Sequence, residues 1–323
     1  MTATRLRNLA FSAILLSLPA FASVDSALLA LVPPNTTVIA GARVDEVKSS
    51  QFGQFVLRNM QMDGDEFQKF IQETGFDPRR DLREVVMATM AAGQNEFDRT
   101  IVIGKGVFNP ARIVSAAKGL GAEVTSYQGV EMLVHREGNH NAAVAFLDAG
   151  LAVMGDSAMV KQAIERRGKG TSLTPQMQSK VASVSAQNQI WFYSAVSPAS
   201  LFAGHISDPN LGGAVKGGLM ESVTQASGGL RFEAKAVKIT GEAVARSDKD
   251  ASALADVFKF LVGIMSSHTD AGTAQPLIEG LDVKSDGNVM KLSMSMSESA
   301  LETLFGDGGR RKVKQTVKSD VVD

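Results

Sequence analysis

The sequence predicts an α+β fold with two related units of antiparallel sheet, helices packed on one face, and an internal duplication. Its 323 residues, 44% of them apolar and 21% charged, are enough for two hydrophobic cores. Apolar and polar residues alternate with period two in segments such as 230–240 and 290–296, which is typical of strands with one buried face. Both halves show a similar order of strand, helical segment, paired strands and helix, and this order indicates the duplication.

Residues 1–22 have the order of residue types that is typical of a secretory signal peptide. Arg5 and Arg7 precede an apolar run, Leu9 to Phe21, and small residues lead up to Ala22. The run of about 13 residues is shorter than the roughly 20 that span a bilayer. We therefore expect cleavage after Ala22 and no transmembrane segment in the mature chain, with a retained anchor as the alternative.

Composition limits the classes of function. The chain has no cysteine, so disulfides, thiolate metal sites and cysteine nucleophiles are excluded. The formal net charge of −1 gives no electrostatic reason to expect nucleic acid as a partner. We expect an exported protein. The periplasm is the favoured location, and secretion or the cell surface are the alternatives.

The first predicted unit covers residues 33–172. Its elements are a strand at 37–44, helical segments at 52–60 and 67–71, strands at 85–91 and 100–105, and a helix from Asn109-Pro110 to Gly119. Two hairpins follow, at 123–136 with a turn at Gln128-Gly129 and at 142–155, and then a helix capped by Asp156 or Ser157 that ends at Gly168.

The second predicted unit covers residues 173–306 and begins with a polar helical stretch where the two units join. Its elements are a helix at 174–185, a strand at 190–196, strands at 230–235 and 237–240, a helix after Asp248, a strand at 290–296 and a last helix capped by Ser297. The helix after Asp248 places an apolar stripe on one side, made of Leu254, Val257, Phe258, Leu261, Val262 and Met265. Residues 307–323, rich in glycine and then basic, predict a flexible tail.

Motifs that resemble catalytic or metal sites are incomplete. His135 and His140 have Glu131 and Glu137 nearby, but only His135 lies on a predicted strand beside Glu131, so no metal is expected. The segment 155–159 resembles the nucleophile elbow of serine hydrolases, but methionine replaces its last glycine, and a helix cap is the favoured role of Ser157. The Gly-Lys-Gly segments 104–106 and 168–170 lack the other residues of a phosphate-binding loop. No cofactor is expected.

Three methionines of the last strand form the one candidate ligand face. Met290, Met294 and Met296 occupy alternate positions, and methionine side chains adapt to irregular apolar shapes. The strand therefore either fills a core or lines a site for an apolar ligand.

The order of several short motifs resembles a family of exported bacterial proteins of unknown function. The motifs are Tyr127-x-Gly-Val130, Gly150 to Gly155, Val160-x-x-Ala-Ile164, Gly170-x-Ser-Leu173 and, upstream, Gly75-Phe-Asp-Pro-x-x-Asp-Leu82. The resemblance covers residues 33–200. It implies export and the tandem α+β architecture, and it implies no activity and no site residue.

The sequence favours a non-enzymatic exported envelope protein that binds or scaffolds another macromolecule, because the catalytic motifs are incomplete. The alternative is a periplasmic carrier of a lipid or other apolar ligand, for which the methionine strand and the apolar stripe would form the site. A hydrolase that uses Ser157 is the third class. The expected partner is thus an unknown envelope protein or an apolar ligand.

Overall fold

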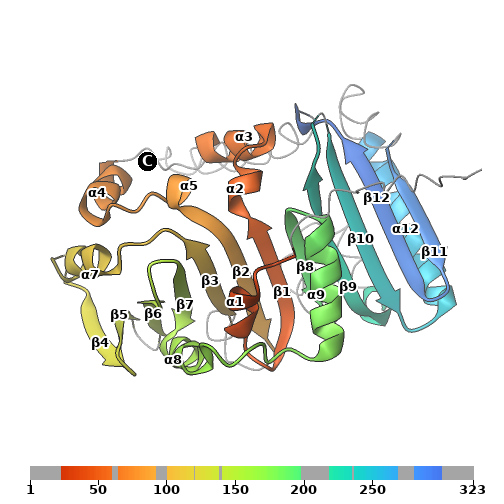
Figure 1. Cartoon of the computed structure of the whole chain (residues 1–323). Coiled ribbons are helices and arrows are strands. Elements are labelled where there is room, and N and C mark those ends of the chain that lie inside the picture. Colours follow the sequence, from red (N-terminus) through yellow and green to blue (C-terminus); the bar gives the residue numbers. More distant parts are fainter. Residues whose placement is uncertain are drawn as a thin grey trace, which may run out of the picture.

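The protein is described here by a computed structural model that covers residues 23–59, 65–91, 100–119, 121–137, 140–197, 218–234, 236–267 and 280–299. The predicted signal peptide, nearly all of the predicted last helix and the predicted tail lie outside these residues. The α+β class is confirmed, since helices accompany a large antiparallel sheet (Figure 1).

The first part of the chain contains strands β1 to β7 with their connecting helices. In chain order these are α1 (Ser26–Ala30), β1 (Thr36–Arg43), α2 (Val44–Val47), α3 (Gln51–Asn59), α4 (Asp65–Thr74), α5 (Pro78–Asp81), β2 (Leu82–Met90), β3 (Thr100–Gly106), α7 (Pro110–Gly119), β4 (Glu123–Tyr127), β5 (Val130–Glu137), β6 (His140–Phe146), β7 (Leu151–Asp156) and α8 (Ser157–Arg166).

The second part supplies the remaining strands. It contains α9 (Pro175–Gln187), β8 (Ile190–Ser194), a short 3-10 turn (Met220–Ser222), β9 (Val223–Phe232), β10 (Val237–Ala245), α12 (Asp248–Ser267), β11 (Asp282–Asp286) and β12 (Val289–Met296). All strands of the described residues belong to one twelve-stranded sheet with the order β11-β12-β10-β9-β8-β1-β2-β3-β7-β6-β5-β4. Strand β8 pairs with both β1 and β9, so the strands of the two predicted units are continuous in one sheet.

One face of the sheet, which we call the covered face, lies under α1, α8 and α9 (Figure 1). The main core forms there. Its largest fully buried side chains include Trp191, Leu28, Ile39 and Ile103. Helix α8 begins where the Asp156 carboxylate accepts a hydrogen bond from the amide of Ala158, and Val160 and Ala163 point into the core.

The opposite face is covered near β9–β12 by α12 and α3. Leu254 and Ala255 of α12 pack in a second core with Ala226, Ala243 and Met290, which are in register on β9, β10 and β12. Phe52 of α3 packs in a third core. The sequence predicted helices on one face, whereas the structure has them on both. The physical reason is that the apolar positions of β9–β12 point away from the covered face.

Local signals identified most elements correctly. The hairpin turn at Gln128-Gly129 is confirmed, because both residues have positive φ angles, 47° and 80°. Asp156, one of the two predicted caps, is the N-cap of α8. Helix α1 and strand β11 were not predicted, because the helix is one turn long and the strand carries a charge at every second position.

Candidate functional site

The face opposite to the covered face carries an unbroken row of residues without polar side chains, which we call the apolar row. Each residue pairs in register with the next one on the neighbouring strand, and the row crosses all twelve strands. From β4 to β11 it consists of Val124, Leu133, Val144, Met154, Val102, Met87, Ala40, Phe192, Gly228, Gly241, Leu292 and Val283.

The middle of the apolar row is exposed. Phe192 on β8 and Met87 on β2 are each 41% exposed, and Met154 on β7 is 48% exposed. Ala40 and Val102 lie between them on β1 and β3. Neighbouring strands are about 4.8 Å apart, so the stretch from Phe192 to Met154 spans about 19 Å. We call these five residues and their immediate surroundings the open face.

A second row without polar side chains runs beside the first on the same face. It joins Ile190, Ala42, Val85, Gly104, Ala152 and Phe146 in register on β8, β1, β2, β3, β7 and β6. The row on the other side of the apolar row is more polar, with Ser194, Thr89 and Thr100 on β8, β2 and β3. The open face therefore has a wide apolar centre and one hydroxyl-rich border.

The sequences of the central strands explain why this face is apolar. Residues 85–88 and 101–103 are apolar at every position, a pattern that predicts strands covered on both faces. Val86 and its register partner Ile103 are fully buried on the covered face, whereas Met87, the residue after Val86, is exposed on the open face. The sequences of these strands are thus typical of strands that are buried on both faces. In the described part of the chain, only their covered face is buried.

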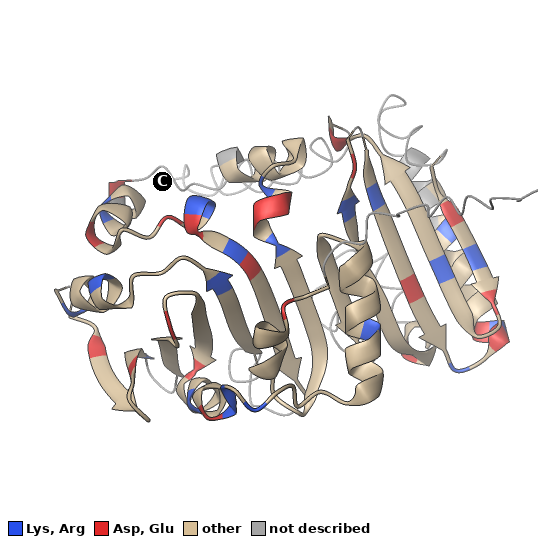
Figure 2. Ribbon diagram, in the orientation of Figure 1, with Lys and Arg blue, Asp and Glu red and all other residues tan. Residues whose placement is uncertain are grey.

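Charge is scarce in this part of the sheet. Figure 2 shows Lys, Arg, Asp and Glu near one end of β1, β2 and β3 and along β10 and β11, whereas β12 carries the one charged residue Lys291. Coulombic attraction therefore contributes little to binding at the open face. Removal of apolar surface from water contributes about 25 cal/mol for each Å² that is covered.

The three predicted methionines lie at the other end of the same face. Met290 is buried in the core beneath α12, and Met296 is buried with Phe52 of α3. Met294 is partly buried beside the same α3 core. On α12, Leu254 of the predicted stripe is buried and Phe258 is 36% exposed, and the side chains at 261, 262 and 265 lie outside the described ones.

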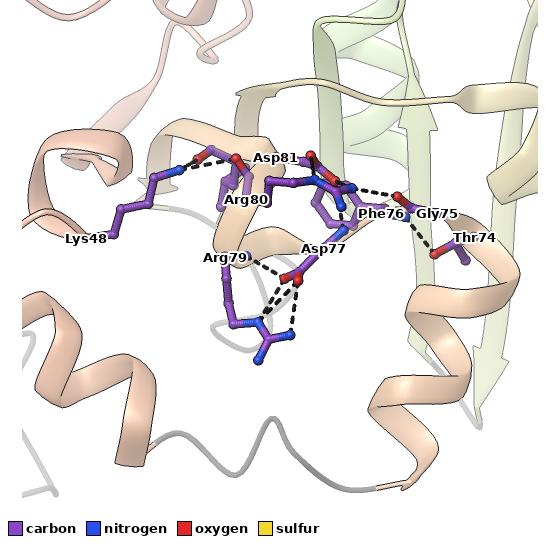
Figure 3. Close-up of polar contacts among 9 residues, drawn as sticks. Lys48, Thr74, Gly75, Phe76, Asp77, Arg79, Arg80 and Asp81 are labelled. Atoms are coloured by element: carbon purple, nitrogen blue, oxygen red, sulfur yellow. Dashed lines mark hydrogen bonds and ion pairs between the residues drawn. The ribbon is translucent and has the colours of Figure 1, made fainter.

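Helix α5 forms a polar corner between α4 and β2 (Figure 3). The Asp77 carboxylate caps α5 by accepting from the amide of Arg79, and it also accepts from the Arg79 guanidinium at 3.0 Å. The Arg80 guanidinium donates to Asp81 at 2.6 and 2.7 Å and to the carbonyl of Gly75 at 3.0 Å. Lys48 donates to the backbone carbonyls at positions 80 and 82.

These contacts shift the pKa values of both acids. The hydrogen bond from Arg79 lowers the pKa of Asp77 below its usual value, and that from Arg80 lowers the pKa of Asp81. Each carboxylate is therefore ionised at neutral pH and already bonded within the corner. Such a cluster shapes the chain between helix and strand.

A second polar group lies at the covered face near α1. Lys105 on β3 donates to Asp25, the N-cap of α1, and this hydrogen bond lowers the pKa of Asp25. The neighbouring Glu84 on β2 accepts from the amide of Asp25, and burial raises the pKa of its carboxyl group. The hydrogen bonds join α1 to the sheet, which is a structural role.

A polar cavity of about 200 Å³ is lined by residues of α9, β9, β10 and β12. Lys180, Asn188, Thr240, Glu242 and Lys291 are among its lining residues. The Thr240 hydroxyl donates to the Asn188 side chain at 3.3 Å. A second cavity of about 400 Å³ lies near α3 and includes Glu46, Glu233 and Glu298 in its lining. No methionine lines either cavity.

The remaining sequence candidates lie in separate elements, and the side chains of Glu137 and His140 lie outside the described ones. His135 is exposed on β5, and no group of metal-binding side chains occurs among the described residues. Ser157 is the first residue of α8, after the Asp156 cap. The segment 104–106 lies in β3, so it is strand and not a loop, and 168–170 is a turn with glycines at positive φ.

Sequence reasoning missed the open face. Phe192, Met87 and Met154 each lie in a segment that was correctly predicted as a strand, but neither the partner strands nor their order can be derived from local patterns. The available signal was the apolar run at 85–88 and 101–103.

Comparison with known proteins shows similarity in structure only. No family profile and no curated protein sequence matches this chain. The structure of crystal form III of TP0453 is similar with a TM-score of 0.52 and 12% sequence identity, over 88% of this chain and 99% of that chain. Crystal form IV of TP0453 gives a TM-score of 0.51 and 11% identity, over 87% of this chain and 97% of that one. TP0453 thus has a similar fold.

Proposed function

We propose that this chain is a non-enzymatic binding module of the bacterial envelope, and that it binds a partner protein through the open face. The observation that carries the proposal is the exposed apolar row, with Phe192, Met87 and Met154 at its centre. Large contiguous apolar patches on a protein surface are typical of interaction sites. The incomplete catalytic motifs support a role without catalysis.

The N-terminal sequence supports a location in the envelope, for which the periplasm is the favoured compartment. Residues 1–22 have the charge and hydropathy order of an export signal. Among the helices of the described ranges, none is long and apolar enough to span a membrane.

The shape of the site favours a protein over a small apolar ligand. A carrier encloses most of its ligand in an apolar pocket. The open face is instead part of a sheet surface, and the two cavities near α9 and α3 have polar and charged residues in their linings. Met290 and Met296, the sequence-based candidates for such a pocket, are buried in cores. A second protein layer packed on the sheet would cover the exposed side chains as in other layered folds.

The test is photo-crosslinking in intact cells of an exporting host. A photoreactive side chain at position 154 lies on the open face, and one at position 161, on α8, lies over the covered face. We expect a protein adduct of one defined mass from position 154 and none from position 161. The double variant Met87→Gln/Phe192→Gln should reduce that adduct at least about fivefold, since it removes apolar surface that the partner covers.

The matched control is Val107→Gln, because Val107 is 51% exposed and lies outside the apolar row. It should leave the adduct unchanged. All these substitutions are at exposed positions, so each should change the free energy of unfolding by less than about 0.5 kcal/mol. A lipid adduct in place of a protein adduct at position 154 would overturn the proposal and favour the carrier function. Equal adducts from positions 154 and 161 would also overturn the proposal.

A further inference from the structure

The open sheet ends in two edge strands of different chemistry, β4 and β11 (Figure 1). An edge strand presents unpaired backbone N–H and C=O groups, which form hydrogen bonds with another strand unless something prevents it. Charged side chains and a covering element are two common means of prevention. The two edges of this sheet differ in the first respect, the charge of their side chains.

Strand β11 is protected. Its side chains at alternate positions are Asp282, Lys284 and Asp286, and α12 packs against it. If β11 paired antiparallel with β11 of a second copy over its full length, Lys284 would oppose Lys284 and Asp282 would oppose Asp286. Like charges directly opposite each other destabilise a strand pair.

Strand β4 lacks the alternating charges of β11, although helices α7 and α8 contact it. Its only charged residue is Glu123, and the Glu123 carboxylate is paired with Arg136 of β5 at 2.7 Å. Val124, Thr125 and Tyr127 are residue types that favour strands. In the described part of the chain β4 pairs with β5 alone.

Strand β4 is also held rigidly by its own chain. The tight turn at Gln128 and Gly129 fixes its register with β5. The Tyr127 hydroxyl donates to Glu165 of α8, and the ammonium group of Lys161 lies over the Tyr127 ring, 5.6 Å from its centre. A fixed edge loses little conformational entropy when a second strand is added.

We propose that β4 pairs antiparallel with β4 of a second copy of this chain, across a two-fold axis at Thr125. In this register Thr125 opposes Thr125, Val124 opposes Ser126, and Glu123 opposes Tyr127. No like charges meet, and a pair of threonines across two strands is favourable. The sheet would continue through the dimer, and the open face with it.

The interface is small, so the dimer depends on concentration. Stable interfaces bury about 1,600 Å², more than a short strand pair covers. We expect a dissociation constant on the order of 10–100 μM. The inference does not depend on the proposed function, because β4 lies at the edge of the sheet and the open face at its middle.

The absence of cysteine makes a direct test possible, since a single introduced cysteine is the only thiol in the chain. Opposed residues of an antiparallel pair have Cα atoms about 4.5–5.5 Å apart, within the range that a disulfide spans. We expect mild oxidation at about 100 μM protein to convert most of the Thr125→Cys variant into a covalent dimer. The control Ser285→Cys, exposed on β11, should stay largely monomeric under the same conditions.

Sedimentation equilibrium supplies an independent readout. Thr125→Lys places two like charges opposite each other and should weaken the dimer about fivefold, whereas Ser285→Lys should leave it unchanged. A chain that remains monomeric at about 500 μM would overturn the proposal. So would equal rates of oxidation at positions 125 and 285. If β4 pairs with a different protein instead, the purified chain would also remain monomeric. That result would therefore contradict the proposed β4–β4 dimer.

Discussion

At the scale of single residues, Gly41 of β1 packs closely against the ring of Trp191 on β8. The Trp191 side chain is 1% exposed. A Cβ atom at position 41 would lie 2.4 Å from Cζ2 and 2.7 Å from Cε2 of its ring, far inside normal contact. The ring lies directly over Gly41, which explains why glycine stands in the middle of a central strand, where it otherwise weakens the strand.

We expect Gly41→Ala to lower the free energy of unfolding by about 1–3 kcal/mol, because the buried ring has to move. Urea denaturation measures this. The matched control is Gly104→Ala on β3, where the nearest atom to a new Cβ would be a Leu82 side-chain carbon at 3.5 Å, an ordinary contact. That variant should change stability by less than about 0.5 kcal/mol. Equal effects at both positions would contradict the packing argument.

At the scale of elements, the corner at α5 connects acidity to stability. The hydrogen bond from Arg80 lowers the pKa of Asp81 below its ordinary value of 3.8. A carboxyl group with a lowered pKa in the folded state stabilises the fold above the unfolded pKa, and this contribution is lost as the pH falls through the folded pKa. The corner should therefore weaken below about pH 4.

We expect Asp81→Asn to lower the free energy of unfolding at pH 7 by about 1–3 kcal/mol, since the charge-assisted bonds from Arg80 are lost. It should also flatten the fall in stability between about pH 5 and pH 2. Urea midpoints measured across this range test both effects. The control Asp256→Asn, exposed on α12, should change the profile by less than about 0.5 kcal/mol. Parallel profiles for Asp81→Asn and the unchanged chain would rule out the titration argument.

At the scale of the whole molecule, local sequence patterns predicted the elements that depend on residues close together in the sequence. The hairpin at Gln128-Gly129 and the helix after Asp156 follow from turn and cap chemistry. The order of strands depends on contacts between distant segments, such as the pairing of β8 with β1. For this reason neither the single continuous sheet nor the in-register apolar row could be derived from the sequence.

The same reasoning explains the position of the helices. Alternation in β9, β10 and β12 shows that one side of each strand is apolar, but it does not show which side of the sheet that is. Strand β8 carries large side chains on both sides, Trp191 toward the covered face and Phe192 toward the open face. The burial therefore changes sides at β8, and the main core and the α12 core lie on opposite faces.

The two cores differ in the size of their side chains, which bears on how the molecule unfolds. The main core contains Trp191, Leu28 and Ile39, whereas alanines make up much of the core beneath α12. Burial of larger apolar side chains stabilises more, at about 0.8 kcal/mol for each buried CH₂ group. The part formed by β9–β12 and α12 should therefore unfold at a lower urea concentration than the part around β1–β8.

Trp191 is the only tryptophan of the chain and lies in the main core, so its fluorescence reports that core alone. Circular dichroism reports both parts. We expect the fluorescence transition at higher urea than the first transition in circular dichroism. Leu254→Ala, in the α12 core, should move only the earlier transition to lower urea, since it lowers the free energy of unfolding of that part by about 2–5 kcal/mol. Val160→Ala, in the main core, should move the later one. Coincident transitions in both signals would show instead that the shared sheet couples the two cores into one cooperative unit.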